Sequence, residues 1–118
     1  MSAKPVVVTE CQTRSGRFVI VSRHPRSGRE IEAFGGARVF RGKSVIDIGT
    51  GVGRLAFDAA RVARHVVGVD PYDEAIRSAR QQANREGFKN VEFRVGDART
   101  FEPRPGERFD LAILSWSL

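Results

Sequence analysis

Apolar residues follow two alternating patterns along most of the chain. Short runs such as "SVIDI" and "HVVGVD" are typical of buried strands, whereas "RLAFDAARVA" and "YDEAIRSARQQANREG" repeat apolar residues every three or four positions, as helices do. These patterns predict strands at 44–48, 65–70, 91–95 and 109–115, and helices at 54–63 and 72–87. Strands that alternate with helices of this length predict an α/β fold with a mainly parallel sheet and right-handed crossovers.

The helix expected at 72–87 has one apolar face. Its apolar residues recur at helical spacing at Ala75, Ile76, Ala79 and Ala83. Gly87 follows this series and is expected to end the helix, because glycine readily takes the left-handed conformation found after a last helical turn. We therefore expect this face to pack against the parallel sheet.

The N-terminal part has a different pattern and a different charge. Two β-type runs, "PVVVTE" and "RFVIVS", flank the turn sequence "TRSG" and predict a β-hairpin. Residues 1–44 hold nine Lys and Arg against three Asp and Glu, whereas residues 45–118 hold eleven of each. We therefore divide the chain into a basic hairpin arm, 1–40, and a main domain, 41–118. The arm is either a weak nucleic-acid contact or simply a solvated segment.

Composition narrows the remaining classes of protein. The chain has 118 residues, enough for one domain with a core, and no apolar run approaches the roughly 18 residues that span a membrane. Its first ten residues lack the apolar centre of a secretory signal, so we expect a cytoplasmic protein without a membrane partner. Cys11 is the only cysteine, which excludes an internal disulfide and a multi-cysteine metal site. We expect no metal, and neither His24 nor His65 is assigned as a base.

A glycine-rich turn follows the first strand of the main domain. The stretch "VIDIGTGVG" places Gly49, Gly51 and Gly53 between a parallel strand and the next helix, where open α/β sheets bind their ligands. Without a Cβ, these residues allow a tight turn and a close approach of a ligand to the backbone. Tight packing within the protein is the alternative explanation for small residues here.

Two further carboxylates follow the next two strands. Asp70 closes the second strand about twenty residues after the glycines, where an acidic side chain can accept hydrogen bonds from both hydroxyls of a ribose. Asp97 lies just beyond the third strand, where its carboxylate could accept from the exocyclic amine of an adenine. Each alone could be an ordinary surface or capping residue. Their order and spacing together predict a nucleoside-containing ligand.

Four successive blocks of the main domain resemble the class I S-adenosylmethionine-dependent methyltransferases. The blocks are "VIDIGTGVGRL", "VVGVDPYDEAI", "VEFRVGDA" and "FDLAILSWSL", within residues 41–118. The resemblance implies a Rossmann-like doubly wound fold, S-adenosylmethionine as cofactor, and methyl transfer to an acceptor that the sequence does not identify. The family's cofactor contacts correspond to Asp47, Gly49, Thr50, Gly51, Asp70, Pro71, Asp97, Ala98 and Ser115.

The resemblance also implies a role for each group of these residues. The four residues of the first block would cradle the methionine part, Asp70 the ribose, and Pro71 one side of the adenine. Asp97 and the backbone of Ala98 would contact the adenine amine, and Ser115 with Trp116 would lie nearest the methyl group. A sulfonium carries its own leaving group, so positioning and exclusion of water are the main requirements, and we name no catalytic residue.

Two departures from the family pattern affect the interpretation. The fourth block reads "SWSL" and lacks the Pro-Pro-aromatic signature of amino-methylating members, so it gives no support for a base amine as acceptor. The chain also stops at Leu118, so we expect a sheet truncated after the fourth strand. In the family order 3-2-1-4 the run "LAILSWSL" would then be an uncovered apolar edge that favours self-association.

Two other functions stay open at this point. A binding-only or inactive cofactor-binding fragment is one, because the parts that commonly supply the acceptor pocket would follow the fourth strand. An NAD(P)-dependent oxidoreductase is the other, but its Gly-x-Gly-x-x-Gly fingerprint would need glycine at position 54, where this chain has Arg54.

Overall fold

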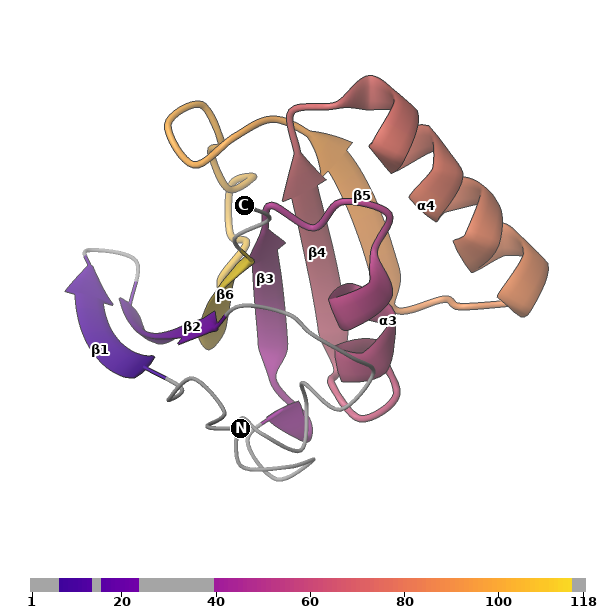
Figure 1. The fold of residues 1–118 in the computed structure, drawn as a ribbon. Helices are drawn as coiled ribbons and strands as arrows, with labels where there is room; N and C mark the ends of the chain where they lie inside the picture. Colours follow the sequence, from indigo (N-terminus) through magenta and orange to yellow (C-terminus); the bar gives the residue numbers. More distant parts are fainter. Residues whose placement is uncertain (1–6, 14–15, 24–39, 116–118) are drawn as a thin grey trace, which may run out of the picture.

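The computed structural model of the chain describes residues 7–13, 16–23 and 40–115 (Figure 1). Its elements, in chain order, are β1 (Val7–Thr13), β2 (Gly16–Arg23), β3 (Ser44–Ile48), α3 (Arg54–Ala60), β4 (His65–Asp70), α4 (Asp73–Glu86), β5 (Val91–Val95) and β6 (Leu111–Ser115). Every strand predicted from the sequence is present, although β6 begins at residue 111 instead of 109. None of the helices in these ranges is long and apolar enough to cross a membrane.

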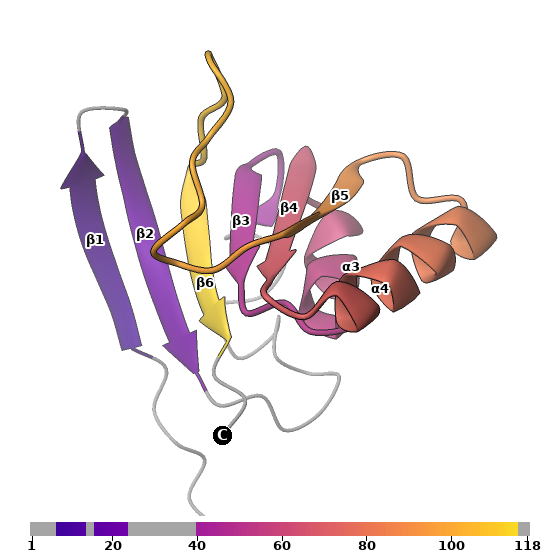
Figure 2. The ribbon, with the colours of Figure 1, turned by 90° about the horizontal axis from the view of Figure 1, so that it is seen from above.

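All six strands form one sheet in the order β1-β2-β6-β3-β4-β5. The four strands of the main domain pair in parallel, and their order confirms the 3-2-1-4 arrangement expected from the sequence. Strands β1 and β2 pair antiparallel, which confirms the predicted hairpin. The molecule is therefore an α/β sheet with the hairpin attached at one side, as Figure 2 shows.

The prediction of an uncovered fourth strand is wrong. Strand β2 pairs in parallel with β6, from Val19 opposite Leu111 to Arg23 opposite Ser115, so both sides of β6 are hydrogen-bonded. The sequence pattern identified the hairpin but not its partner, because strand pairing between distant segments depends on register rather than on local composition. The expected self-association through β6 loses its structural basis. The domain boundary at residue 40 stays a prediction.

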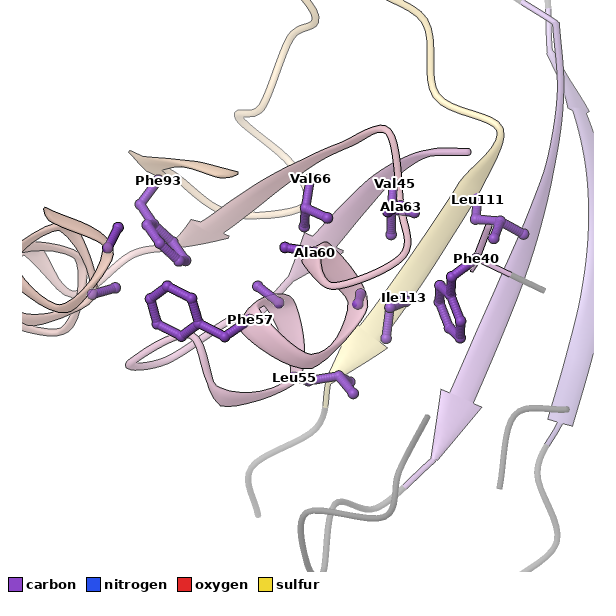
Figure 3. Packing of buried hydrophobic residues seen from close by; sticks show 14 of the residues in the cluster. Phe40, Val45, Leu55, Phe57, Ala60, Ala63, Val66, Phe93, Leu111 and Ile113 are labelled. Carbon is purple, nitrogen blue, oxygen red and sulfur yellow. The ribbon is translucent and has the colours of Figure 1, made fainter. Parts of the chain in front are cut away.

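Both helices lie on the same face of the sheet and cover its larger core. Side chains alternate along each strand, so Val45 and Val66 point toward the helices while Ile46 and Val67 point to the other face. Figure 3 shows the helix-side cluster, in which Phe57 of α3 lies between the strands and α4. Its ring contacts those of Phe88 and Phe93 at centroid distances of 5.0 and 5.4 Å.

The opposite face carries a smaller apolar cluster. Ile46, Val67 and Val69 are buried there beneath Phe101 and Phe109, which come from the connection between β5 and β6. Their two rings contact each other at 6.1 Å. Within the described residues the sheet is therefore covered on both faces, by helices on one and by this connection on the other.

The helix ends show where the sequence patterns were accurate. Gly87 ends α4 with a φ of 72°, as predicted. Helix α3 ends at Ala60, three residues before the predicted position. Here the side-chain amide of Asn90 donates to the carbonyls of Ala60 and Ala63, at 2.7 and 3.1 Å. A contact from a residue so far along the chain is invisible to local periodicity.

Candidate functional site

The loop between β3 and α3 takes its shape from three glycines and from strand β4. Gly49, Gly51 and Gly53 have φ values of 82°, 59° and 91°, in the left-handed region that favours glycine. The amides of Gly49 and Thr50 both donate to the carbonyl of Val69, at 2.8 and 2.9 Å. The loop is thus held against the carboxyl end of the neighbouring strand.

Asp47 lies beneath this loop. Its side chain is fully buried, and Oδ2 accepts a hydrogen bond from the hydroxyl of Thr50 at 2.9 Å. A buried carboxylate without partners would be costly, so this bond both stabilises Asp47 and fixes Thr50. Since both side chains are buried, Asp47 influences the loop surface through Thr50.

Asp70 joins the loop to the end of β4. It is almost fully buried, its Oδ2 accepts from the amide of Gly51, and its Oδ1 accepts from the amide of Tyr72, both at 2.9 Å. A carboxylate has about four acceptor positions, so each oxygen retains capacity for a further donor. Pro71 and Tyr72, which follow, are exposed beside it.

The space around the glycines differs from one to the next. A Cβ added to Gly51 would meet no atom within 4 Å, so this part of the loop borders open space. A Cβ at Gly53 would lie 2.7 Å from Cζ of Phe93, and one at Gly68 would lie 2.7 Å from both Phe93 and Thr50. Gly51 therefore fits the expectation of close ligand approach, whereas Gly53 is small because Phe93 packs on it.

Asp97 lies after β5 in a turn that it stabilises itself. Its Oδ1 accepts from the amides of Arg99 and Thr100, at 2.8 and 3.0 Å, and from the Thr100 hydroxyl at 3.1 Å. These bonds, led by that of the Arg99 amide, hold the pKa of the Asp97 carboxyl below its usual value. Its Oδ2 lies 3.7 Å from a guanidinium nitrogen of Arg99, and the side chain is 34% exposed.

The structure brings the predicted residues to one end of the sheet. The amide of Gly96 donates to the carbonyl of Asp70 at 3.0 Å, which joins the ends of β4 and β5 next to the glycine loop. Ala98 is exposed in the turn of Asp97. Ser115 ends β6, directly after the residue paired with Ile48, so its backbone lies level with the start of the loop. Trp116 lies outside the described residues.

An ionic cluster that the sequence analysis missed holds the connection carrying Asp97. Both terminal nitrogens of Arg94 bond the carboxylate of Glu107, at 2.8 and 2.6 Å, and its Nε bonds Glu92. The Arg94 guanidinium lowers the pKa of Glu107 to about 2. It also lies 5.9 Å from the ring centroid of Phe101. The sequence could have indicated part of this cluster, because Glu92 and Arg94 occupy alternate positions of one strand and so lie on the same face. Nothing in the sequence indicated that Glu107 would join them.

The described part of the chain contains no group of three or more His, Cys, Asp or Glu that could hold a metal ion. What it offers at the strand ends is a set of hydrogen-bond acceptors beside a bare stretch of backbone. Such a set can bind a ligand that presents hydroxyl and amino groups.

Comparison with known proteins places these features in context. Residues 40–118 match the family described as "Methyltransferase domain". The chain is 39% identical over 75 residues to an uncharacterized RNA methyltransferase of Halalkalibacterium halodurans, covering 61% of this chain and 16% of that protein. It is 32% identical over 88 residues to a ubiquinone biosynthesis O-methyltransferase of Bradyrhizobium diazoefficiens, covering 75% of this chain and 31% of that protein. The chain thus spans less than a third of these relatives.

Solved structures show the same similarity. The YcgJ protein from Bacillus subtilis matches 66% of this chain and 34% of its own, with a TM-score of 0.59 and 30% identity. A second match is phosphoethanolamine N-methyltransferase 1 of Haemonchus contortus, solved in complex with phosphoethanolamine and S-adenosylhomocysteine. The match covers 66% of this chain and 16% of that one, with a TM-score of 0.58 and 27% identity.

Proposed function

Because this chain belongs to the methyltransferase domain family, we propose that it binds S-adenosylmethionine at the carboxyl ends of β3, β4 and β5 as part of a methyltransferase. The observation that supports this most directly is the junction of Asp70 with the amide of Gly51. It places an acidic acceptor next to a loop segment with open space in front of it. The cofactor supplies a sulfonium-bound methyl group.

The residues present fit the three parts of this cofactor. Asp70 has acceptor capacity left for the ribose hydroxyls, with Pro71 exposed beside it for the adenine ring. Asp97 uses Oδ1 for its own turn, which leaves Oδ2 to accept from the adenine amine, with the Ala98 backbone as a second contact. The turn hydrogen bonds that lower the pKa of Asp97 favour its charged form, which is the stronger acceptor.

The methionine part would lie along the glycine loop. Gly49 and Gly51 form its surface, while Asp47 and Thr50 act from beneath as positioning residues. We place Ser115, at the end of β6, on the floor near the reactive end. None of these residues needs to exchange a proton for the cofactor to be held and oriented, so the chain's own contribution is binding geometry and exclusion of water.

The test is titration calorimetry of the chain with S-adenosylmethionine. We expect Asp70→Asn to weaken binding by about 1.5–3 kcal/mol, the value of hydrogen bonds to a charged group. Asp73→Asn is the matched control, because Asp73 lies three residues away, is exposed and pairs with Arg77 instead of the loop. Equal affinity of Asp70→Asn and the unchanged chain would contradict the site. Binding of NAD in preference to S-adenosylmethionine would instead support an oxidoreductase.

For the acceptor we propose RNA, in the cytoplasm. Three relatives with 39%, 41% and 35% identity are each named as uncharacterized RNA methyltransferases. The basic excess of residues 1–44 supports a polyanionic partner. Other relatives are named for phosphoethanolamine and for ubiquinone biosynthesis, so a small-molecule acceptor is the alternative. Transfer of labelled methyl groups to RNA, compared with a small-molecule extract, distinguishes the two.

A further inference from the structure

The segments that precede the parallel strands are hydrogen-bonded side by side. The amide of Arg64 donates to the carbonyl of Lys43 at 2.9 Å, and the amide of Asp110 donates to that of Ser44 at 2.7 Å. The carbonyl of Asn90 accepts from the amide of the second residue of β4 at 2.8 Å. All four segments therefore meet at the amino ends of the strands, opposite the proposed cofactor site (Figure 1).

This end of the sheet is strongly basic. Segments 41–44, 61–65, 87–90 and 108–110, which we call the amino rim, contain one acidic residue, Asp110. Its Oδ2 accepts from the amide of Ser44 at 2.9 Å. The same segments carry six exposed cationic residues: Arg41, Lys43, Arg61, Arg64, Lys89 and Arg108. Four of these six cations come from residues 45–118, in which basic and acidic residues are equal in number, so the topology gathers positive charge at this end of the sheet.

Several of these cations are available to a partner. Within the described residues, Lys43, Lys89 and Arg108 take part in no ion pair. Arg61 has only a long contact of 3.9 Å with Asp58, and Arg64 bonds the hydroxyl of Ser44 at 3.2 Å. A cluster in which exposed cations outnumber acidic side chains creates a positive potential that attracts polyanions.

We propose that the amino rim binds the phosphate backbone of the RNA acceptor. This proposal rests on the RNA methyltransferase function proposed above and adds where the acceptor is held. Strands of five or six residues separate the rim from the cofactor end by about 17–20 Å. Contacts so far from the cofactor would position the RNA on the protein rather than read the target base.

The distribution of apolar side chains favours RNA over a membrane surface. Interfacial membrane binding combines cations with apolar side chains that enter the lipid. The exposed large apolar residues of the described part are Val52, Tyr72 and Val95, and each follows the carboxyl end of a strand or ends one. They lie at the opposite end of the sheet from the amino rim, which therefore has the charge but lacks the apolar side chains that a lipid surface needs.

The experiment measures binding of the full chain to a single-stranded RNA oligonucleotide by fluorescence anisotropy at several salt concentrations. The salt slope is about 0.7 for each single-strand phosphate contact, so each contact raises affinity about fivefold at 0.1 M salt relative to 1 M. The double variant Lys43→Gln with Lys89→Gln removes two contacts and should weaken binding about 25-fold. The slope of log K against log salt should become shallower by about 1.4. Both side chains are exposed, so the fold should be unaffected, which circular dichroism checks.

The matched control removes two exposed cations at the opposite end of the sheet, Arg77→Gln with Arg99→Gln. It should weaken RNA binding far less than the rim variant does, because salt screens exposed charges beyond about 10 Å. Equal losses in both double variants, or no RNA binding by the unchanged chain, would overturn the proposal. So would rim-dependent binding to vesicles of anionic lipid without binding to RNA. Calorimetry of the rim variant with S-adenosylmethionine separates this result from the cofactor proposal, because its cofactor affinity should be unchanged.

Discussion

Three glycine-to-alanine variants separate backbone strain from packing around the loop after β3. Gly51 has a φ of 59° and open space where a Cβ would be, so alanine there meets strain alone. At Gly68, in strand β4, alanine meets a contact of 2.7 Å with Phe93 without a left-handed backbone. Gly53 combines both, with a φ of 91° and a distance of 2.7 Å to Phe93.

The expected losses follow from these geometries. Left-handed backbone costs an alanine about 1–2 kcal/mol. Forcing an additional carbon into a packed core costs about 1–3 kcal/mol. We therefore expect unfolding free energies lowered by about 1–2 kcal/mol for Gly51→Ala, about 1–3 for Gly68→Ala and about 2–5 for Gly53→Ala.

Urea denaturation followed by circular dichroism gives these values, provided that the slope with urea does not change. Gly53→Ala combined with Phe93→Leu isolates the packing part, because shortening Phe93 should relieve the contact and make the double loss smaller than the sum of the single losses. If Gly53→Ala is no more destabilising than Gly51→Ala, Phe93 does not constrain the loop. The assignment of Gly53 to packing would then be refuted.

Two further predictions concern contacts between distant segments. Glu107→Gln should destabilise the fold by about 1–3 kcal/mol at pH 7. Since the folded pKa of Glu107 is about 2 against a usual value of 4.5, its stabilisation is complete above about pH 4.5 and is lost as the pH falls toward 2. Urea denaturation should give a smaller difference in unfolding free energy between Glu107→Gln and the unchanged chain at pH 3 than at pH 7. A difference that does not change with pH would argue against this ion pair. Asn90→Ala should cost about 1–3 kcal/mol by thermal denaturation, because it leaves two carbonyls at the end of α3 without their donor. Asn84→Ala, at an exposed position of α4, should leave the melting temperature unchanged. Equal destabilisation by Asn84→Ala and Asn90→Ala would contradict the capping role of Asn90.

The sequence predicted features that depend on neighbouring residues. Apolar runs located the strands, and Gly87 located the end of α4. Both features depend on the types of a few adjacent residues, which the sequence shows directly. The order of the four parallel strands also followed, since crossover handedness and family resemblance leave few alternatives. The acidic residues Asp70 and Asp97 reached one end of the sheet for the same topological reason.

Features that join distant segments could not be predicted. The pairing of β2 with β6 joins residues about ninety positions apart, and the hairpin pattern alone does not specify a partner. The ion pair of Arg94 with Glu107 and the contact of Phe93 with Gly53 likewise require the folded arrangement. The packing role of Gly53 could not be predicted for the same reason, because a small residue indicates a close approach without identifying the group that approaches.

Strand β4 determines the geometry of the candidate site more than the loop's own sequence does. Its last three residues each fix part of the loop: Gly68 leaves room for Thr50, the carbonyl of Val69 accepts two loop amides, and Asp70 accepts from Gly51.

Asp70 therefore has two roles, as anchor of the loop and as proposed acceptor for the ribose. A ligand held by Asp70 interacts with a carboxylate whose position the loop has already set, so ordering of the loop and binding are thermodynamically coupled. It follows that variants which loosen the loop from beneath, at Thr50 or Gly68, should weaken cofactor binding without touching the cofactor.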